Sequence, residues 1–136
     1  MTPSTKTAPD HSPAQHSPAR DTATPVYPVV TPEISKRRAT LVPGAHSAFQ
    51  EFSRQVFATG ALDKKTKQLI AVAVAHVTQC PYCIQGHTKA AVRNGASEQE
   101  LMEAIWVSAE MRAGGAYAHA TLALDAAANA KSRRAE

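Results

Sequence analysis

Residues 69–87 read LIAVAVAHVTQCPYCIQGH, an apolar run followed closely by a proline between two cysteines. The run has no polar side, so it predicts a fully buried helix, which we place at about 64–79 with Asp63 as its N-cap. Proline is disfavoured inside a helix but suits its first position. A second helix is therefore expected to begin at Pro81, with the preceding cysteine as its cap, and to end at Gly95, since glycine readily adopts the left-handed conformation.

A helix is also expected before this pair. Phe49, Phe52 and Val56 are spaced i, i+3 and i+7, which indicates a helix near 45–58 with one apolar face. Gly60 follows closely and is a suitable end signal. The buried run is thus preceded by an amphipathic helix.

Further helical signals follow the second cysteine. Ser97-Glu98-Gln99-Glu100 is a capping box, which opens a helix. Gly114-Gly115 is expected to break that helix before an alanine-rich one near 116–131. No segment shows the alternation of polar and apolar residues that marks a half-buried strand. The predicted fold class is therefore all-α.

The N-terminal part has a different composition from the rest. Seven of the nine prolines lie within the first 32 residues, among many Ser, Thr and Ala residues and few bulky apolar ones. Such a segment cannot bury enough apolar surface to offset the entropy lost on folding. We therefore expect residues 1–25 to be a disordered tail and residues 26–136 to form one domain. Only seven aromatic residues are present, so the core is modest and self-association is expected to stabilise it.

The net charge of +4 lies at the two ends of the chain. Residues 41–130 carry seven basic and seven acidic groups, so no basic surface is built into the fold and a nucleic-acid partner is not expected. Lys36-Arg37-Arg38 and Arg133-Arg134 are interpreted as solvated ends. No apolar run is long enough to cross a bilayer, and the N-terminus lacks the apolar centre of a secretory signal. We expect a cytoplasmic protein without a membrane partner.

The chemistry of the chain is concentrated in Cys80-Pro81-Tyr82-Cys83 and His87. In a CxxC pair one sulfur attacks an oxidant or a disulfide, and the other resolves the product as an intramolecular disulfide. The first turn of a helix favours a thiolate, because its free N–H groups and the helix dipole are positive there. His87 lies four residues after Cys83, hence on the same helical face, where it can exchange a proton with the thiol.

Two other interpretations of the cysteines remain open at this point. Free cysteines are often simply buried, small apolar residues. Alternatively, His76, Cys80, Cys83 and His87 have the ligand types of a zinc site. Four ligands on one continuous helix would span about 16 Å, too far for one ion at about 2.0–2.3 Å from each ligand. A redox role without a metal or another cofactor is therefore favoured.

The apolar run, the CPYCIQGH motif, Gly95-Ala96 and Glu100 together resemble the AhpD-like, or carboxymuconolactone decarboxylase-like, family over roughly residues 60–125. The resemblance implies a compact all-helical domain that forms trimers or hexamers, with thiol peroxidase or thiol-disulfide activity and no haem, flavin or metal. It also implies residue roles: Cys83 attacks the peroxide, Cys80 resolves the product, and His87 relays the proton.

The chain departs from the family pattern at one relay position. The family glutamate, twelve residues before the first cysteine, is replaced by Gln68, which keeps the size but cannot accept a proton at neutral pH. His76 is a candidate substitute base, and Glu110 is another from the following helix. Tyr82 occupies a position that is a relay histidine in some relatives, and with Gln68 it is expected to position water.

The sequence therefore predicts an alkylhydroperoxidase-like enzyme. The Cys80/Cys83 dithiol would reduce a hydroperoxide, most simply an organic one, and an unknown thiol or protein reductant would restore it. Two alternatives stay open. The protein would either exchange disulfides with another protein, as a partner or redox sensor, or act as a carboxymuconolactone decarboxylase-like lyase on the same fold.

Overall fold

The computed structural model of the protein describes residues 26–132 and contains helices but no strand in that range, so the predicted all-α class is confirmed. The predicted tail, residues 1–25, and the basic end at 133–134 lie outside the described residues. No helix in the described range is long and apolar enough to span a membrane. The six helices are α1 (Pro32–Leu41), α2 (Pro43–Val56), α3 (Lys64–Thr78), α4 (Pro81–Arg93), α5 (Glu98–Ala118) and α6 (Ala120–Ser132).

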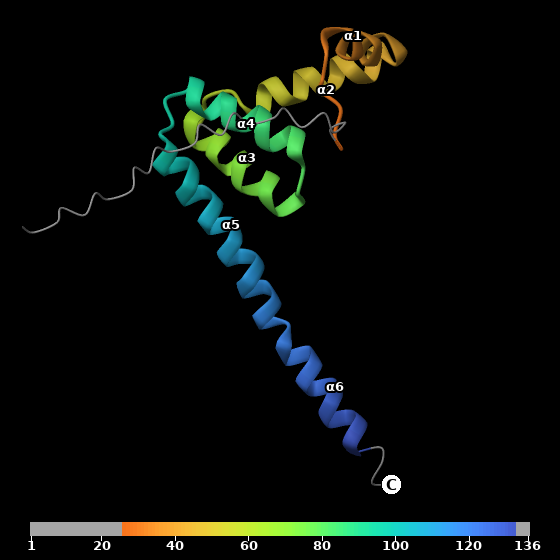
Figure 1. Ribbon diagram of the computed structural model, residues 1–136, viewed down its shortest axis with the longest axis vertical. Helices are drawn as coiled ribbons and strands as arrows, with labels where there is room; N and C mark the ends of the chain where they lie inside the picture. Colours follow the sequence, from red (N-terminus) through yellow and green to blue (C-terminus); the bar gives the residue numbers. More distant parts are fainter. Residues whose placement is uncertain (1–25, 133–136) are drawn as a thin grey trace, which may run out of the picture.

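The core forms where α3 packs against α4 and α5. Figure 1 shows this three-helix unit, with α1 and α2 extending from one side and α5 continuing into α6 on the other. Val72 of α3 and Ala91 of α4 are fully buried, and Leu101 of α5 is nearly so. Leu69 and Ile105 pack against this cluster. Small residues at the contact allow the helices to approach closely, and this packing fixes α4 relative to α3.

The prediction that α3 is fully buried is wrong for the single chain. The side chains of Ile70, Val74 and Val77 are about half exposed, at 48%, 53% and 45%. Among the described helices, α4 and α5 make the extensive contacts with α3, and these residues of α3 stay outside those contacts. The continuous apolar run therefore supplies both the core face and a second, uncovered apolar face.

The predicted break at Gly114-Gly115 is also wrong, because α5 continues through both glycines to Ala118. Of the described glycines, only Gly95 has a positive φ, 86°, and it ends α4 as predicted. Glycine lowers helix stability by about 1 kcal/mol relative to alanine but does not by itself end a helix. His119 alone separates α5 from α6, and its N–H still donates to the carbonyl of Gly115 at 3.2 Å.

One helix was not predicted. In α1, Pro32 occupies the first turn, and the Thr31 hydroxyl accepts a hydrogen bond from the N–H of Ile34 at 3.2 Å. Neither α1 nor α2 contains a buried residue, and they pack on each other. The Nζ of Lys67 donates to the carbonyls of Val56 and Ala58 at 2.8 and 2.7 Å, which attaches the end of α2 to α3.

The start of α5 is attached to the start of α3 by an ion pair. Glu100 completes the predicted capping box with Ser97, and its other oxygen accepts from the Nζ of Lys65 at 2.6 Å. The hydrogen bond from Lys65, followed by that from the Ser97 backbone, lowers the pKa of Glu100 below its ordinary value. The same pair raises the pKa of Lys65.

Glu100→Gln keeps a residue suited to the capping box but removes the charge that pairs with Lys65. Because the pKa of Glu100 is lowered in the folded state, its contribution is present above the ordinary value of 4.5 and is lost as the pH falls through the folded-state pKa. We expect the variant to be less stable than the wild type at neutral pH, with a difference that shrinks on acidification. Urea unfolding of both proteins down to about pH 3 measures it, and a difference that does not depend on pH would contradict the assignment.

Candidate functional site

A hydrogen-bonded turn places the first cysteine between two helices. After α3 ends, Gln79 adopts a left-handed conformation with φ of 54°. The N–H groups of Gln79 and Cys80 both donate to the carbonyl of Ala75, which satisfies one of the free carbonyls at the end of α3 through a left-handed C-cap. Pro81 then starts α4, and Cys80 is its N-cap, as predicted. The turn thus sets where the thiols lie relative to the core.

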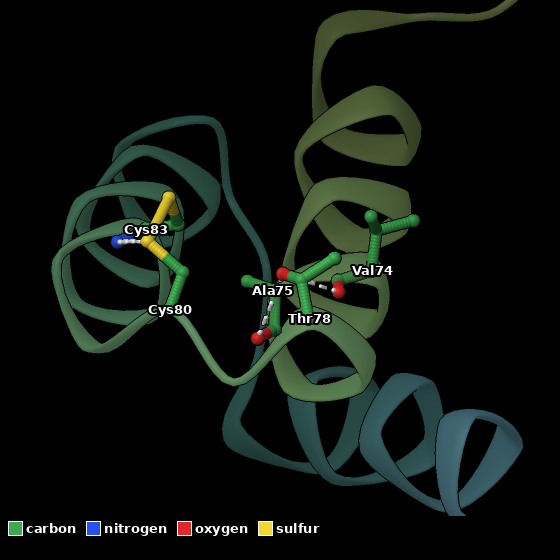
Figure 2. The surroundings of a disulfide bond; sticks show 5 residues. All are labelled: Val74, Ala75, Thr78, Cys80 and Cys83. Carbon is green, nitrogen blue, oxygen red and sulfur yellow. Dashed lines mark hydrogen bonds between the residues drawn. A yellow bond between two sulfur atoms is a disulfide. The ribbon is translucent and has the colours of Figure 1, made fainter. Parts of the chain in front are cut away.

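Cys80 and Cys83 are joined by a disulfide across the first turn of α4, with their Cα atoms 5.3 Å apart. Figure 2 shows this disulfide on α4, with Ala75 and Thr78 near the end of the neighbouring α3. The N–H of Cys83 also points at the sulfur of Cys80, at 3.3 Å. The two sulfurs are therefore within reach for a dithiol-disulfide cycle, and the helix N-terminus is a setting that favours a thiolate.

An open cavity of about 810 Å³ lies between α2 and α4. Cys83 lines this cavity together with His87, Gln68 and Tyr82, whereas Cys80 is not among its lining residues. These four predicted site residues are thus brought together on one cavity.

Gln68 and His87 form a partly buried hydrogen bond between α3 and α4. The Oε1 of Gln68 lies 2.8 Å from the Nδ1 of His87, and Gln68 itself is only 8% exposed. A carbonyl oxygen can only accept, so Nδ1 must donate its hydrogen. In the neutral imidazole the other nitrogen, Nε2, is then unprotonated and able to accept a proton. Gln68 therefore orients His87 as an acceptor, but it does not add a negative charge.

Phe57, just after α2, packs on the same imidazole. The two ring centroids are 5.1 Å apart, and the ring planes are tilted by 35°. Phe57 also lines the cavity. The imidazole is thus held on one side by a hydrogen bond and on another by an aromatic ring.

Tyr82 contacts the segment that precedes α1. Its hydroxyl donates to the carbonyl of Pro28 at 2.8 Å, and its ring lies edge-on to Tyr27, with centroids 6.0 Å apart. The hydroxyl hydrogen is therefore already committed to a backbone carbonyl, and only the oxygen lone pairs remain for water. Tyr82 holds this N-terminal segment beside the first turn of α4.

The other base candidates, His76 and Glu110, do not line the cavity. The Nδ1 of His76 lies 2.8 Å from the carbonyl of Val72 on its own helix, and His76 does not line the cavity. Glu110 is an exposed residue of α5 beside Gly114. Within residues 26–132, no group of three or more His, Cys, Asp or Glu side chains is arranged to hold a metal ion, so the alternative zinc site has no ligand set there.

Several lining residues were missed by sequence reasoning, and two of them contribute to the arguments below. Arg38 of α1 lines the cavity although its segment was interpreted as a solvated end, and Phe57 was not singled out at all. The apolar Val56-Phe57 pair was a weak signal for the second. No sequence pattern predicts that Arg38 lines the cavity, because its position depends on how α1 packs on α2.

Comparison with protein families gives one match that spans most of this region. A family model described as "Carboxymuconolactone decarboxylase family" matches residues 43–126. The matched segment contains the cysteine pair, His87 and Gln68, but not α1.

Curated proteins and solved structures give similar matches. The chain is 71% identical over 77 residues to "Uncharacterized protein 4 in cox locus" of Paracoccus denitrificans, covering 57% of this chain and 69% of that one. It is 40% identical over 82 residues to an uncharacterized protein of Cupriavidus necator, covering 60% and 73%. An apo carboxymuconolactone decarboxylase family protein from Legionella pneumophila is 35% identical with a TM-score of 0.53, covering 58% and 73%. A protein from Methanobacterium thermoautotrophicum is 32% identical with a TM-score of 0.61, covering 66% and 98%.

Proposed function

The chain belongs to the carboxymuconolactone decarboxylase family, and we propose that it acts as a thiol peroxidase that reduces organic hydroperoxides. The observation that carries the proposal is the position of Cys83. It opens onto the cavity together with His87, while Cys80, its disulfide partner, does not line that cavity. A substrate in the cavity would therefore meet Cys83 first, and Cys80 would be left to resolve the product.

In the first step the reduced Cys83 attacks the hydroperoxide. The Nε2 of His87 takes the thiol proton, and the thiolate attacks the terminal peroxide oxygen. A sulfur–oxygen bond forms as the oxygen–oxygen bond breaks, and the alkoxide takes the proton back from His87 and leaves as an alcohol. The peroxide gains two electrons, and Cys83 becomes a sulfenic acid.

In the second step Cys80 resolves the sulfenic acid. Its sulfur attacks that of Cys83, the disulfide forms, and the hydroxyl leaves as water with the Cys80 proton. The disulfide between Cys80 and Cys83 is the bond that this step would form. A thiol or protein reductant then supplies two electrons and two protons. This fits a reducing compartment such as the cytoplasm, which we propose as the location.

Gln68 has a positioning role in this mechanism. Its amide fixes the orientation of His87 through Nδ1 but cannot itself take a proton. The proton would therefore pass between Cys83 and His87 directly, without a second relay carboxylate. Tyr82 would support the wall of the cavity through its bond to Pro28.

Specific observations also favour two other uses of the site. The description of the matching family favours a lyase acting on a lactone acid, and such chemistry does not need the cysteines. Retained activity on a lactone acid in the double variant Cys80→Ser, Cys83→Ser would support it. The glutamine at position 68 favours exchange with a protein disulfide, which fast exchange combined with slow peroxide turnover would support.

Cysteine variants test the peroxidase proposal. Cys83→Ser is expected to reduce hydroperoxide turnover to the uncatalysed level, because the attacking sulfur is removed. Cys80→Ser is expected to stop after one turnover, with a sulfenic acid on Cys83 that dimedone traps and mass spectrometry locates. Peroxide consumption by Cys83→Ser is followed with a dithiol reductant in excess, whereas Cys80→Ser is reduced first and assayed without reductant, because a dithiol would itself reduce the sulfenic acid. Full turnover by Cys83→Ser, or dimedone labelling of Cys80 in that variant, would show that the roles are assigned wrongly.

Gln68→Glu is expected to accelerate disulfide formation by about tenfold, because a carboxylate on Nδ1 stabilises the imidazolium formed when His87 takes the thiol proton. The pH range in which disulfide formation is fast should also extend to higher pH. Gln68→Met, which keeps the size without the hydrogen bond, is the matched control and should slow the reaction. Single-turnover rates at several pH values measure both effects, and equal rates in all three proteins would argue against a role for this hydrogen bond.

The proposal extends to self-association. Besides the uncovered face of α3, the two C-terminal helices carry exposed apolar residues, and α6 has no buried residue. Monomeric proteins rarely expose apolar patches of this extent. A trimer or hexamer that covers them would enlarge the modest core. The exposed apolar residues of α5 and α6 are Met102, Trp106, Val107, Met111, Tyr117, Leu122 and Leu124.

Trp106→Glu is expected to dissociate the assembly, because it replaces a large apolar side chain of this surface, 69% exposed in the single chain, by a charge. Glu103→Gln on the same helix is the control and should leave the assembly intact. Light scattering at micromolar concentration should give a multiple of 14.4 kDa for the wild type. A monomeric wild type at that concentration would refute self-association.

A further inference from the structure

Arg38 is the one cavity residue contributed by α1. It lines the large cavity together with Cys83 and His87, and it also lines a neighbouring cavity of about 320 Å³ bordered by Val29, Val30 and Tyr82. Its position depends on α1 folding back beside α2, outside the family-matched segment 43–126. Arg38 is therefore a feature of this chain in addition to the family site.

Among the described residues, Arg38 is the arginine of the cavity that has no carboxylate partner. The other lining arginine, Arg54, forms a two-fold hydrogen bond with Glu51, at 2.8 and 2.6 Å. Within the described residues, no carboxylate forms an ion pair with Arg38, and no Asp or Glu lines the cavity. A guanidinium in this setting is suited to a carboxylate, which it binds through two parallel hydrogen bonds.

The wall next to Arg38 is apolar. Phe49, Phe52 and Val56, which form the apolar face of α2, line the cavity and remain 65%, 63% and 43% exposed. Gly86, which has no side chain, and Ala90 of α4 also line the cavity and leave room in it. The cavity of about 810 Å³ is large enough for an extended organic molecule.

We propose that this cavity binds a hydroperoxide with an apolar body and a carboxylate end, held by Arg38 while the peroxide group faces Cys83. The inference rests on the proposed peroxidase function and names its substrate class. The chemistry is unchanged: the hydroperoxy acid is reduced to a hydroxy acid as Cys83 is oxidised. The phenylalanines of α2 would bind the apolar body, and Arg38 would select the acid over a neutral analogue.

The test compares a medium-chain hydroperoxy carboxylic acid with its methyl ester. In the wild type we expect kcat/KM to favour the acid by about fivefold, the scale of a partly exposed charged pair. Arg38→Met removes the charge while keeping an unbranched side chain, and the preference should then disappear. Arg37→Met, a neighbour on α1 that does not line the cavity, is the matched control and should keep it.

The inference would be overturned if the wild type showed no preference for the acid. It would also be overturned if the preference survived Arg38→Met, or if Arg37→Met lost the preference to the same extent. A second measurement distinguishes failure of the carboxylate-binding inference from failure of the peroxidase proposal. The corresponding hydroxy acid and its methyl ester are titrated calorimetrically against the full chain. Tighter, Arg38-dependent binding of the acid supports the carboxylate site even if no hydroperoxide is turned over, and equal binding of acid and ester contradicts it.

Discussion

The close packing of α3 against α4 is the constraint on which the rest of the structure depends. Val72 and Ala91 are fully buried where the two helices meet. Gln68 lies one turn before Val72, and His87 lies one turn before Ala91, so the faces that form the core also carry the site. Their side chains meet in the hydrogen bond that orients His87. The chemistry is thus supported by the best-buried part of the molecule, and the pair needs no mobile loop to bring it together.

Local signals predicted much of the fold. The Asp63 cap, the Cys80 cap with Pro81, Gly95 and the Ser97–Glu100 capping box were all confirmed, because each depends only on residues a few positions apart. The errors concern long-range effects. The burial of α3 depends on how many helices pack against it, and α5 continues through its glycines because neither adopts a left-handed conformation. The roles of Arg38, Lys65 and Lys67 depend on contacts with residues far away in the sequence, which local residue spacing does not predict.

The site combines side chains from two parts of the molecule. The core helices α3 and α4 supply the imidazole and the amide that orients it, and the thiols lie at the start of α4. The arm formed by α1 and α2 supplies the phenylalanines and Arg38 on the facing wall. If the proposed function is correct, α3 and α4 carry out the reaction and the arm selects the substrate. Such an arrangement allows specificity to change without disturbing the reacting groups.

The most direct test of the account is a thiol count on fully reduced, chelator-treated protein, before and after one equivalent of an organic hydroperoxide with timed quenching. The chain has only two cysteines, so the count reports the site alone. The account predicts that both thiols disappear together within seconds, that one equivalent of alcohol is formed, and that dithiothreitol restores both thiols. Persistence of both thiols while the hydroperoxide remains intact would contradict the peroxidase mechanism.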